Sequence, residues 1–207
     1  MITELDPVEA RVLGSLVEKS LTTREQYPLT FNSLLNACNQ KTSREPVMSL
    51  DAEALGKAVR TLAEKGLLER LEVPGSRAPK FRHNIGKLLN SDDVKITAVM
   101  TVLLLRGPQT PGEIKGRTER LCDFSGTAEV EGVLNEICSR PADAMAARLP
   151  RRAGQKETRY RHLFSGLSPA EADIPPPAAD RLSALEKKVE ALEGMVRSLE
   201  ERLPKAA

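Results

Sequence analysis

Two stretches of this chain share the order basic, aromatic, Arg, His. They are "KFRH" at 80–83 and "RYRH" at 159–162, and they contain the only two histidines of the 207 residues. Such stretches can bind phosphate, because each Lys or Arg that neutralises a nucleic-acid phosphate releases a condensed counterion. Metal binding or catalysis by the histidines is less well supported, since no carboxylate or cysteine is spaced to complete a site with them. We therefore expect both histidines to pack at the edge of a core.

Basic residues are concentrated around both stretches. Residues 73–87 contain four basic residues and no acidic one, and residues 148–162 contain six basic residues against one acidic residue. A third basic group lies in "KGRTER" at 115–120. Clusters of this kind predict contacts with nucleic-acid phosphates. The residues predicted to make them are Arg77, Lys80, Arg82, Lys115, Arg117, Arg120, Arg151, Arg152, Lys156, Arg159 and Arg161.

The polar segment "NACNQKTSREP" at 36–46 is a second candidate for recognition. Its amide, hydroxyl and basic side chains can hydrogen-bond base edges, phosphates or the backbone of a partner protein. Asn and Ser also commonly satisfy backbone groups within turns, and the two interpretations are comparably supported. The residues predicted to form this polar recognition loop are Asn39, Gln40, Lys41 and Arg44.

The sequence carries no motif typical of an enzyme. It contains no Gly-rich phosphate loop after a strand and no nucleophile elbow, and Cys38, Cys122 and Cys138 lack metal-ligand spacing. We therefore expect no enzymatic activity, no cofactor and no metal, and cysteines that are reduced and mostly buried. No apolar run reaches the roughly 20 residues of a membrane helix. The start "MITELDPVEA" does not resemble a signal peptide, so we expect a cytoplasmic protein without membrane association.

The elements that must position the basic stretches recur in the same order twice. In the first half, Asp6 and Glu9 predict a helix start with a capping box, and apolar residues then follow at helical spacing. A short helix is expected within 31–38 and a third helix over about 51–65. Alternating residues on either side of a Pro- and Gly-containing turn predict a β-hairpin within 67–85.

Residues 91–165 repeat this order. Ser91 is the expected N-cap of a strongly apolar helix, and Thr110 with Glu113 predicts a second capping box. A third helix is expected within 126–140, followed by strand, turn and strand. The hairpins match at a single offset of 79 residues in three pairs, which are Gly75 with Gly154, Phe81 with Tyr160, and Ile85 with Phe164. Three helices followed by a hairpin is the order of a winged helix-turn-helix domain.

Three phrases carry a resemblance to a known family. "EARVLGSLVEK" at 9–19, "QYPLTFNSLLNACNQKTSREPVMSL" at 26–50 and "LLLRGPQTPGEIKGRTERL" at 103–121 closely resemble the YceH-like family of uncharacterised bacterial proteins. The resemblance covers most of residues 6–165 and implies two tandem winged-helix domains, in agreement with the order of elements. It implies no activity and no catalytic or ligand-binding residues.

The end of the chain follows a different pattern. A Pro-rich linker spans 167–179, and beyond it apolar residues recur at alternating spacings of 3 and 4. This dimer seam consists of Leu182, Leu185, Val189, Leu192, Val196, Leu199 and Leu203. A strict two-position stripe favours a coiled coil over a helix that folds back on its own domains. In a parallel dimer Arg181 and Lys188 meet Glu186 and Glu193 of the partner, so parallel pairing is favoured.

We therefore predict a mainly α chain with small β-hairpin wings, of the α+β class. It consists of two tandem winged helix-turn-helix domains, a linker and a coiled-coil helix. Their predicted boundaries are 1–87 for the first domain, 88–166 for the second, 167–179 for the linker and 180–204 for the C-terminal helix. The predicted assembly is a homodimer formed through that helix.

The predicted function is DNA binding of the kind that transcriptional regulators show. The alternative is a protein-interaction scaffold that uses its winged helices without DNA. The third helices favour the alternative, because Asp51 and Glu53 open one of them and the other carries Glu129, Glu131 and Glu136. These carboxylates would repel phosphates where a recognition helix normally meets DNA. The two halves also carry nearly balanced charge, unlike a dedicated DNA-binding domain.

Overall fold

The computed structural model describes residues 4–72, 78–141, 143–151 and 157–165. All of these belong to one compact unit, residues 1–168. The predicted linker and dimer seam lie outside the described residues, as do Arg77, Arg152 and Lys156.

The first helix begins where its capping box predicts. In α1 (Pro7–Thr22), an Asp6 carboxylate oxygen accepts from the backbone N–H groups of Val8 and Glu9, each at 2.8 Å. Glu9 accepts in return from the backbone N–H of Asp6, also at 2.8 Å. The reciprocal bonds satisfy donors that a helix start otherwise leaves without partners. A short 3₁₀ turn, η1 (Arg24–Gln26), follows.

Two helices and a small sheet complete the first half. The helices are α2 (Phe31–Cys38) and α3 (Ala52–Glu64). The predicted hairpin is formed by β2 (Leu68–Leu71) and β3 (Lys80–His83), which pair antiparallel. A two-residue strand, β1 (Leu29–Thr30), pairs with the other edge of β3, which gives the order β1-β3-β2. A short helix, α4 (Ile85–Leu89), leads into the second half.

The second half repeats the order of three helices and an antiparallel pair. Its elements are α5 (Val94–Arg106), α6 (Pro111–Thr118), α7 (Thr127–Ser139), β4 (Ala146–Arg148) and β5 (Tyr160–His162). The capping box of α6 is confirmed, since Thr110 and Glu113 exchange both bonds. The expectation of Ser91 as the N-cap of α5 is wrong, because Asp93 caps this helix. Its carboxylate accepts two backbone N–H groups, and its negative charge suits a helix N-terminus.

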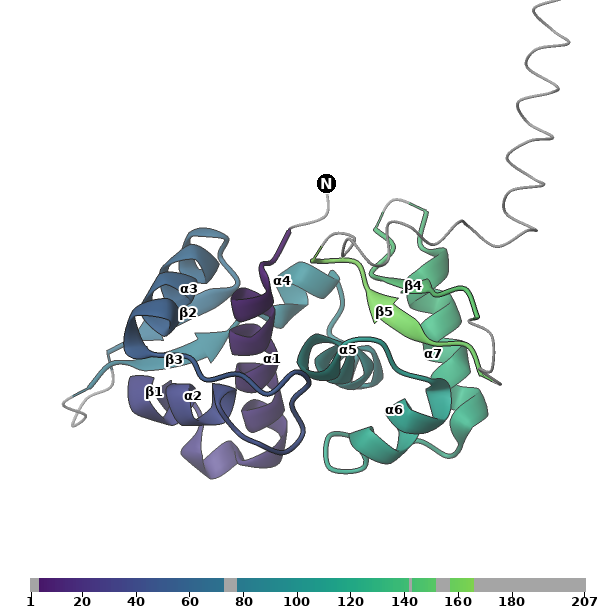
Figure 1. Cartoon of the computed structure of the whole chain (residues 1–207), viewed down its shortest axis with the longest axis horizontal. Coiled ribbons are helices and arrows are strands. Elements are labelled where there is room, and N and C mark those ends of the chain that lie inside the picture. Colours follow the sequence, from purple (N-terminus) through teal and green to yellow (C-terminus); the bar gives the residue numbers. More distant parts are fainter. Residues whose placement is uncertain (1–3, 73–77, 142, 152–156, 166–207) are drawn as a thin grey trace, which may run out of the picture. The chain divides into compact units, whose positions relative to one another are not determined.

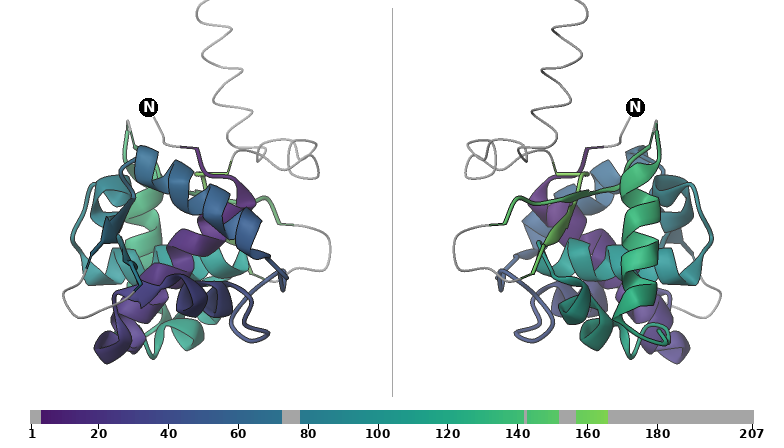
Figure 2. Two further views of the ribbon diagram at one scale, coloured as in Figure 1. Left: turned by 90° about the vertical axis from the view of Figure 1, so that its left-hand side faces the viewer. Right: turned by 90° about the vertical axis from the view of Figure 1, so that its right-hand side faces the viewer.

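Helices α1 and α5 form the centre of the unit. They make the most extensive contact between any two described elements and lie side by side between the two β-hairpins (Figures 1 and 2). Gly14 allows this approach, because a Cβ atom there would lie 3.0 Å from Leu105. Of the pairs predicted to correspond, Phe81 and Tyr160 are both buried, as are Ile85 and Phe164, whereas Gly75 and Gly154 lie outside the described residues. The architecture is therefore mixed α and β, with small antiparallel sheets.

Candidate nucleic-acid interface

The cations of the first hairpin are largely engaged within the fold. Arg82 lies opposite Glu69 in the register of β2 and β3, and its guanidinium forms an ion pair with that carboxylate. Lys80 is half-buried on the same strand. The ion pair is exposed, so it adds little to stability. It nevertheless neutralises Arg82, which was predicted to contact phosphate.

The arginines of the second hairpin lie in different surroundings. Arg159 donates to both carboxylate oxygens of Glu113, at 2.9 and 3.0 Å. Arg161, one of the predicted phosphate contacts, is only 7 % exposed and so lies within the fold rather than on its surface. Strand β5 is covered on both faces at this point, because the neighbouring Tyr160 is buried as well. Arg151 is exposed and donates to the Thr158 hydroxyl at 3.1 Å, and among the described residues it forms no ion pair.

Both histidines lie half-buried at the edge of the core, which confirms the prediction from their strand positions. His83 Nε2 lies 2.8 Å from the Ser20 hydroxyl, and the backbone N–H of His83 donates to the Tyr27 hydroxyl at 2.7 Å. Burial, together with the weaker effect of the positive charge of Arg82, lowers the pKa of His83 to about 4. His162 stacks on Phe164 with 6.1 Å between ring centroids.

The third helices present few cations. The exposed face of α3 mixes Glu53 and Glu64 with Lys57 and Arg60. Helix α7 contains no Lys or Arg between Thr127 and Ser139, and its exposed face carries Glu131 and Glu136. Glu129 is neutralised by Lys95 and also accepts from Ser125. Glu136 pairs with Arg140 just beyond the helix, but Glu131 is exposed and the helix carries no cation of its own, so this face offers DNA phosphates little attraction.

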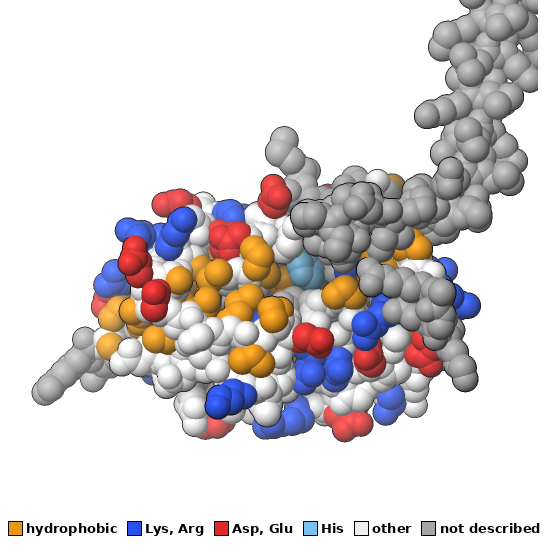
Figure 3. All heavy atoms as spheres, viewed as in Figure 1, with side chains coloured by type: hydrophobic (Ala, Val, Ile, Leu, Met, Phe, Trp, Pro, Cys, Tyr) orange, Lys and Arg blue, Asp and Glu red, His pale blue; other side chains and the backbone are white. Residues whose placement is uncertain are grey.

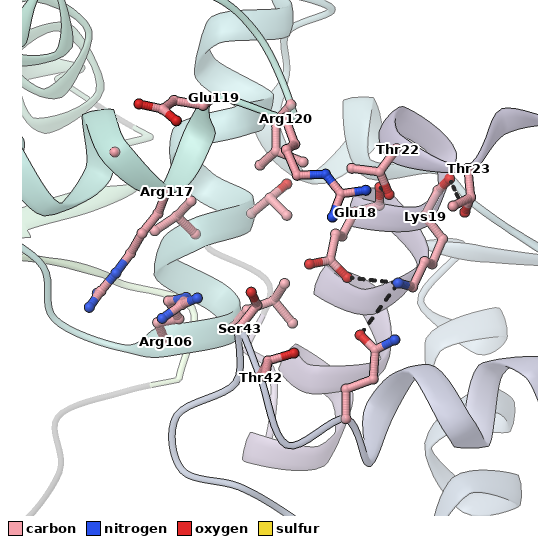
Figure 4. A pocket seen from close by; sticks show the side chains of 16 residues that line it. Glu18, Lys19, Thr22, Thr23, Thr42, Ser43, Arg106, Arg117, Glu119 and Arg120 are labelled. Carbon is pink, nitrogen blue, oxygen red and sulfur yellow. Dashed lines mark hydrogen bonds and ion pairs between the residues drawn. The ribbon is translucent and has the colours of Figure 1, made fainter.

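A cleft of about 370 Å³ lies between α1 and α6 (Figure 4). Gln40, Thr42 and Ser43 of the predicted polar loop line one part of it, and Arg117 and Arg120 of the predicted basic group line another. The structure thus brings together two candidate groups that are far apart in the sequence. The charged residues of the lining are Lys19, Arg106, Arg117, Arg120, Glu18 and Glu119, which give it a net charge of +2.

Most side chains of the predicted polar loop are used in hydrogen bonds and ion pairs within the fold. Arg44 is 5 % exposed and donates to the carboxylate of Glu18 and the carbonyl of Ala37. The side-chain amide of Asn39 both donates to and accepts from the backbone of Leu50. Gln40 Oε1 accepts from both Lys19 and Arg44. Of the four residues predicted for recognition, Lys41 is the one whose whole residue is exposed.

Two further arginines were not identified from the sequence. Arg11 is 1 % exposed and donates to the carbonyls of Cys38 and Pro46, so it anchors both ends of the polar loop. The sequence clue to this role was the position of Arg11 among the apolar residues of the first helix. Arg106, the last residue of α5, lies in the cleft beside Arg117 (Figure 4). The sequence clue to Arg106 was its position shortly before the basic group at 115–120.

Two other kinds of site are absent from the part of the chain that the structure describes. No helix there is long and apolar enough to cross a membrane. No group of three or more His, Cys, Asp or Glu residues there could hold a metal ion.

Comparison with known proteins places the chain in a family. Residues 5–155 match the family model described as "Protein of unknown function, DUF480". The chain belongs to the DUF480 family. A UPF0502 protein of Aeromonas hydrophila is 42% identical to this DUF480 protein over 214 residues, which cover 96% of each chain. A UPF0502 protein of Geotalea daltonii is 46% identical over 183 residues, covering 88% of this chain and 83% of the relative. The resemblance to an uncharacterised bacterial family that the sequence phrases indicated is thereby confirmed.

Proposed function

We propose that this DUF480 protein binds DNA and that its second half supplies most of the phosphate contacts. The predicted phosphate contacts that remain unpaired carry the proposal. Among the described residues of that predicted set, Lys80, Lys115, Arg120 and Arg151 form no ion pair, and the last three belong to the second half. The hairpin residues Arg82 and Arg159 are each paired with a carboxylate. Figure 3 shows Lys and Arg side chains along the side of the molecule where α1 and α6 lie, interspersed with a few acidic ones.

The order of elements supports a winged-helix assignment for each half. Three helices precede an antiparallel hairpin in both, and Phe81 and Tyr160, which are 79 residues apart, lie in the second strand of each hairpin. In this kind of domain the third helix and the hairpin commonly lie beside the nucleic acid. We further propose that the predicted seam at 182–203 joins two copies. A dimer would double the number of phosphate contacts and so steepen the dependence on salt.

The acidic face of α7 suggests which kind of binding to expect. Phosphate contacts fix a protein on the duplex without reading sequence, whereas discrimination needs side chains that reach base edges. Glu131 and Glu136 are exposed on α7, and their carboxylates disfavour insertion of this helix into a DNA groove to contact base edges. We therefore propose binding that is dominated by the phosphate backbone and is weakly selective for sequence.

The test is a titration of a fluorescently labelled random-sequence duplex with the full-length protein, followed by anisotropy. Affinity in the micromolar range at low salt, falling steeply between about 50 and about 200 mM salt, is the expected result. No binding at the lowest salt concentration would contradict the proposal, because a backbone-directed protein must bind random DNA under those conditions.

A protein-interaction scaffold is the second candidate, and one observation favours it. Val47 and Val94 are large apolar side chains with 57% and 51% of their surface exposed. Figure 3 also shows apolar side chains gathered on the face of the first half. A scaffold would leave the random duplex unbound at every salt concentration, so the same titration separates the two functions.

A further inference from the structure

We propose that the cleft between α1 and α6 binds a small anion that carries a phosphate group, with Arg106 and Arg117 as its principal ligands. The proposal concerns the protein free of DNA and goes beyond duplex binding. It rests on the arrangement of two arginines, on their lack of partners and on the hydroxyl groups beside them.

The two arginines come from different helices and converge on one space. Arg106 ends α5, and the preceding residues 101–105 are all buried, so its backbone position is fixed by the core. Arg117 lies in the last turn of α6. Both residues line the same cleft, and Figure 4 shows Arg106 and Arg117 on the same side of it, on neighbouring helices. Two guanidinium groups held in this manner can each donate in a bidentate fashion to phosphate oxygens.

Neither guanidinium has a close carboxylate partner within the described part of the chain. Arg106 forms no ion pair or side-chain hydrogen bond there. Arg117 approaches Glu113 only at 4.0 Å, and Arg159 binds the same carboxylate more closely, at 2.9 Å. Arg117 Nη1 is buried and has no hydrogen-bond partner. Burying a donor without an acceptor costs about 1–3 kcal/mol of free energy, and more when the donor is charged. An anion bound at this position would accept from Arg117 and remove that cost.

The arginines also oppose each other. Burial lowers the pKa of Arg106, and the positive charge of Arg117 lowers it further. The carboxylates Glu18 and Glu45 act on Arg106 in the opposite direction, and Arg44 adds to the repulsion. A dianion between the two guanidinium groups would replace repulsion by attraction on both sides.

The loop after α2 adds hydroxyl groups to the cleft. Thr42 and Ser43 line it, and their hydroxyls make no hydrogen bond with any described residue. Ser43 has a left-handed backbone with φ 58°, which the surrounding structure must impose. The cleft volume of about 370 Å³ falls within the usual range of small-ligand sites. Inorganic phosphate, pyrophosphate and a mononucleotide all fit this description of charge, donors and size.

The test measures binding of three probes to full-length, DNA-free protein by calorimetry at constant ionic strength. The probes are inorganic phosphate, pyrophosphate and adenosine monophosphate, with chloride as the competing salt. We expect saturable binding of at least one probe and at least a tenfold loss of affinity in Arg106→Gln and in Arg117→Gln. Arg60→Gln, which removes an exposed arginine of α3, should bind as tightly as the wild type. No binding of any probe, or equal binding in all variants, would overturn the proposal.

The phosphate group could also belong to the DNA backbone, and duplex binding by the same variants decides this. If the probes bind and Arg106→Gln keeps its duplex affinity, the cleft is a site for free phosphate compounds, as proposed. If no probe binds and Arg106→Gln loses duplex affinity, the cleft belongs to the DNA interface and the inference is overturned. If the probes bind to a protein that binds no duplex, the proposed function fails and the cleft site stands.

Discussion

Arg44 and Glu18 form an ion pair with two hydrogen bonds, at 3.1 Å from Nη1 to Oε1 and 2.6 Å from Nη2 to Oε2. The pair ties the loop after α2 to α1, and Arg44 is almost fully buried in it. This contact fixes one edge of the cleft, because the loop residues Thr42 and Ser43 directly precede Arg44.

Replacing Arg44 by Met should lower the free energy of unfolding by about 3 kcal/mol, because poorly hydrated Glu18 is left with only the more distant Lys19, at 3.6 Å, as an ion-pair partner. Urea denaturation at neutral pH measures the change. Arg60→Met removes an exposed arginine of α3 and should stay within about 0.5 kcal/mol of the wild type. Equal stability of the two variants would show that the buried pair does not hold the loop.

Protonation of Glu18 should weaken the same contact. Burial would raise the pKa of Glu18, but the hydrogen bonds and charge of Arg44 outweigh that effect and lower it. A carboxylate with a lowered pKa contributes stability above its ordinary pKa and loses that contribution as the pH falls. In Arg44→Met the partner is gone, so this acid-side loss of stability should be smaller than in the wild type. An unchanged acid-side slope would contradict the assignment.

His83 should make stability depend on pH in a higher window. Its pKa is about 4 in the folded chain against 6.5 ordinarily, so between these values the unfolded state binds a proton that the folded state does not. Stability is therefore complete above about pH 6.5 and falls towards pH 4, by at most about 1.4 kcal/mol per pH unit. Urea denaturation of the wild type and of His83→Gln at several pH values measures this. The variant should show a shallower slope in this window, and identical slopes would exclude His83 as the cause.

Gly14 should be intolerant of larger residues. A Cβ atom at this position would meet Leu105 at 3.0 Å and Leu104 at 3.2 Å, so Gly14→Val forces α1 and α5 apart. We expect a loss of about 1–3 kcal/mol in the free energy of unfolding. Gly56→Val is the matched control, because nothing lies within 4 Å of a Cβ atom at that position of α3. If both variants lose the same amount, helix propensity rather than packing sets the effect.

Much of this fold could be predicted because local signals and tertiary structure agree. The capping boxes at Asp6 and Thr110 each place a helix start correctly. The alternation within each hairpin predicts the strands, and the offset between Phe81 and Tyr160 predicts their equivalence. Such patterns are readable because each depends on residues a few positions apart.

Features that depend on distant contacts were not predictable. The strand β1 exists only because β3 offers it an edge, and two residues are too few to carry an alternation pattern. Arg161 is buried although its place in a basic cluster predicted a contact with phosphate. Arg106 and the polar loop line the same cleft because α1 packs on α5. No local sequence pattern specifies that packing.

The apolar seam at 182–203 predicts a dimer of the 22.7-kDa chain. Light scattering during size-exclusion chromatography should give the mass of two chains for the wild type and of one chain for Leu192→Asp, which places a charge in the seam. Gly194→Ala lies at an outer position and should leave the dimer intact while favouring the helix by about 1 kcal/mol. A monomeric wild type, or a dimeric Leu192→Asp, would show that this seam does not join the copies.

The most direct test of DNA binding by the second half compares two triple variants in the anisotropy titration. One replaces Lys115, Arg120 and Arg151 by Gln, and the other replaces Arg24, Lys57 and Arg60, which are exposed in the first half and form no ion pair among the described residues. Both remove three positive charges. The first should flatten the slope of log affinity against log salt by about 2–3 units per chain, and the second should leave it nearly unchanged. Equal slopes for the two variants, or no duplex binding by the wild type, would contradict the account.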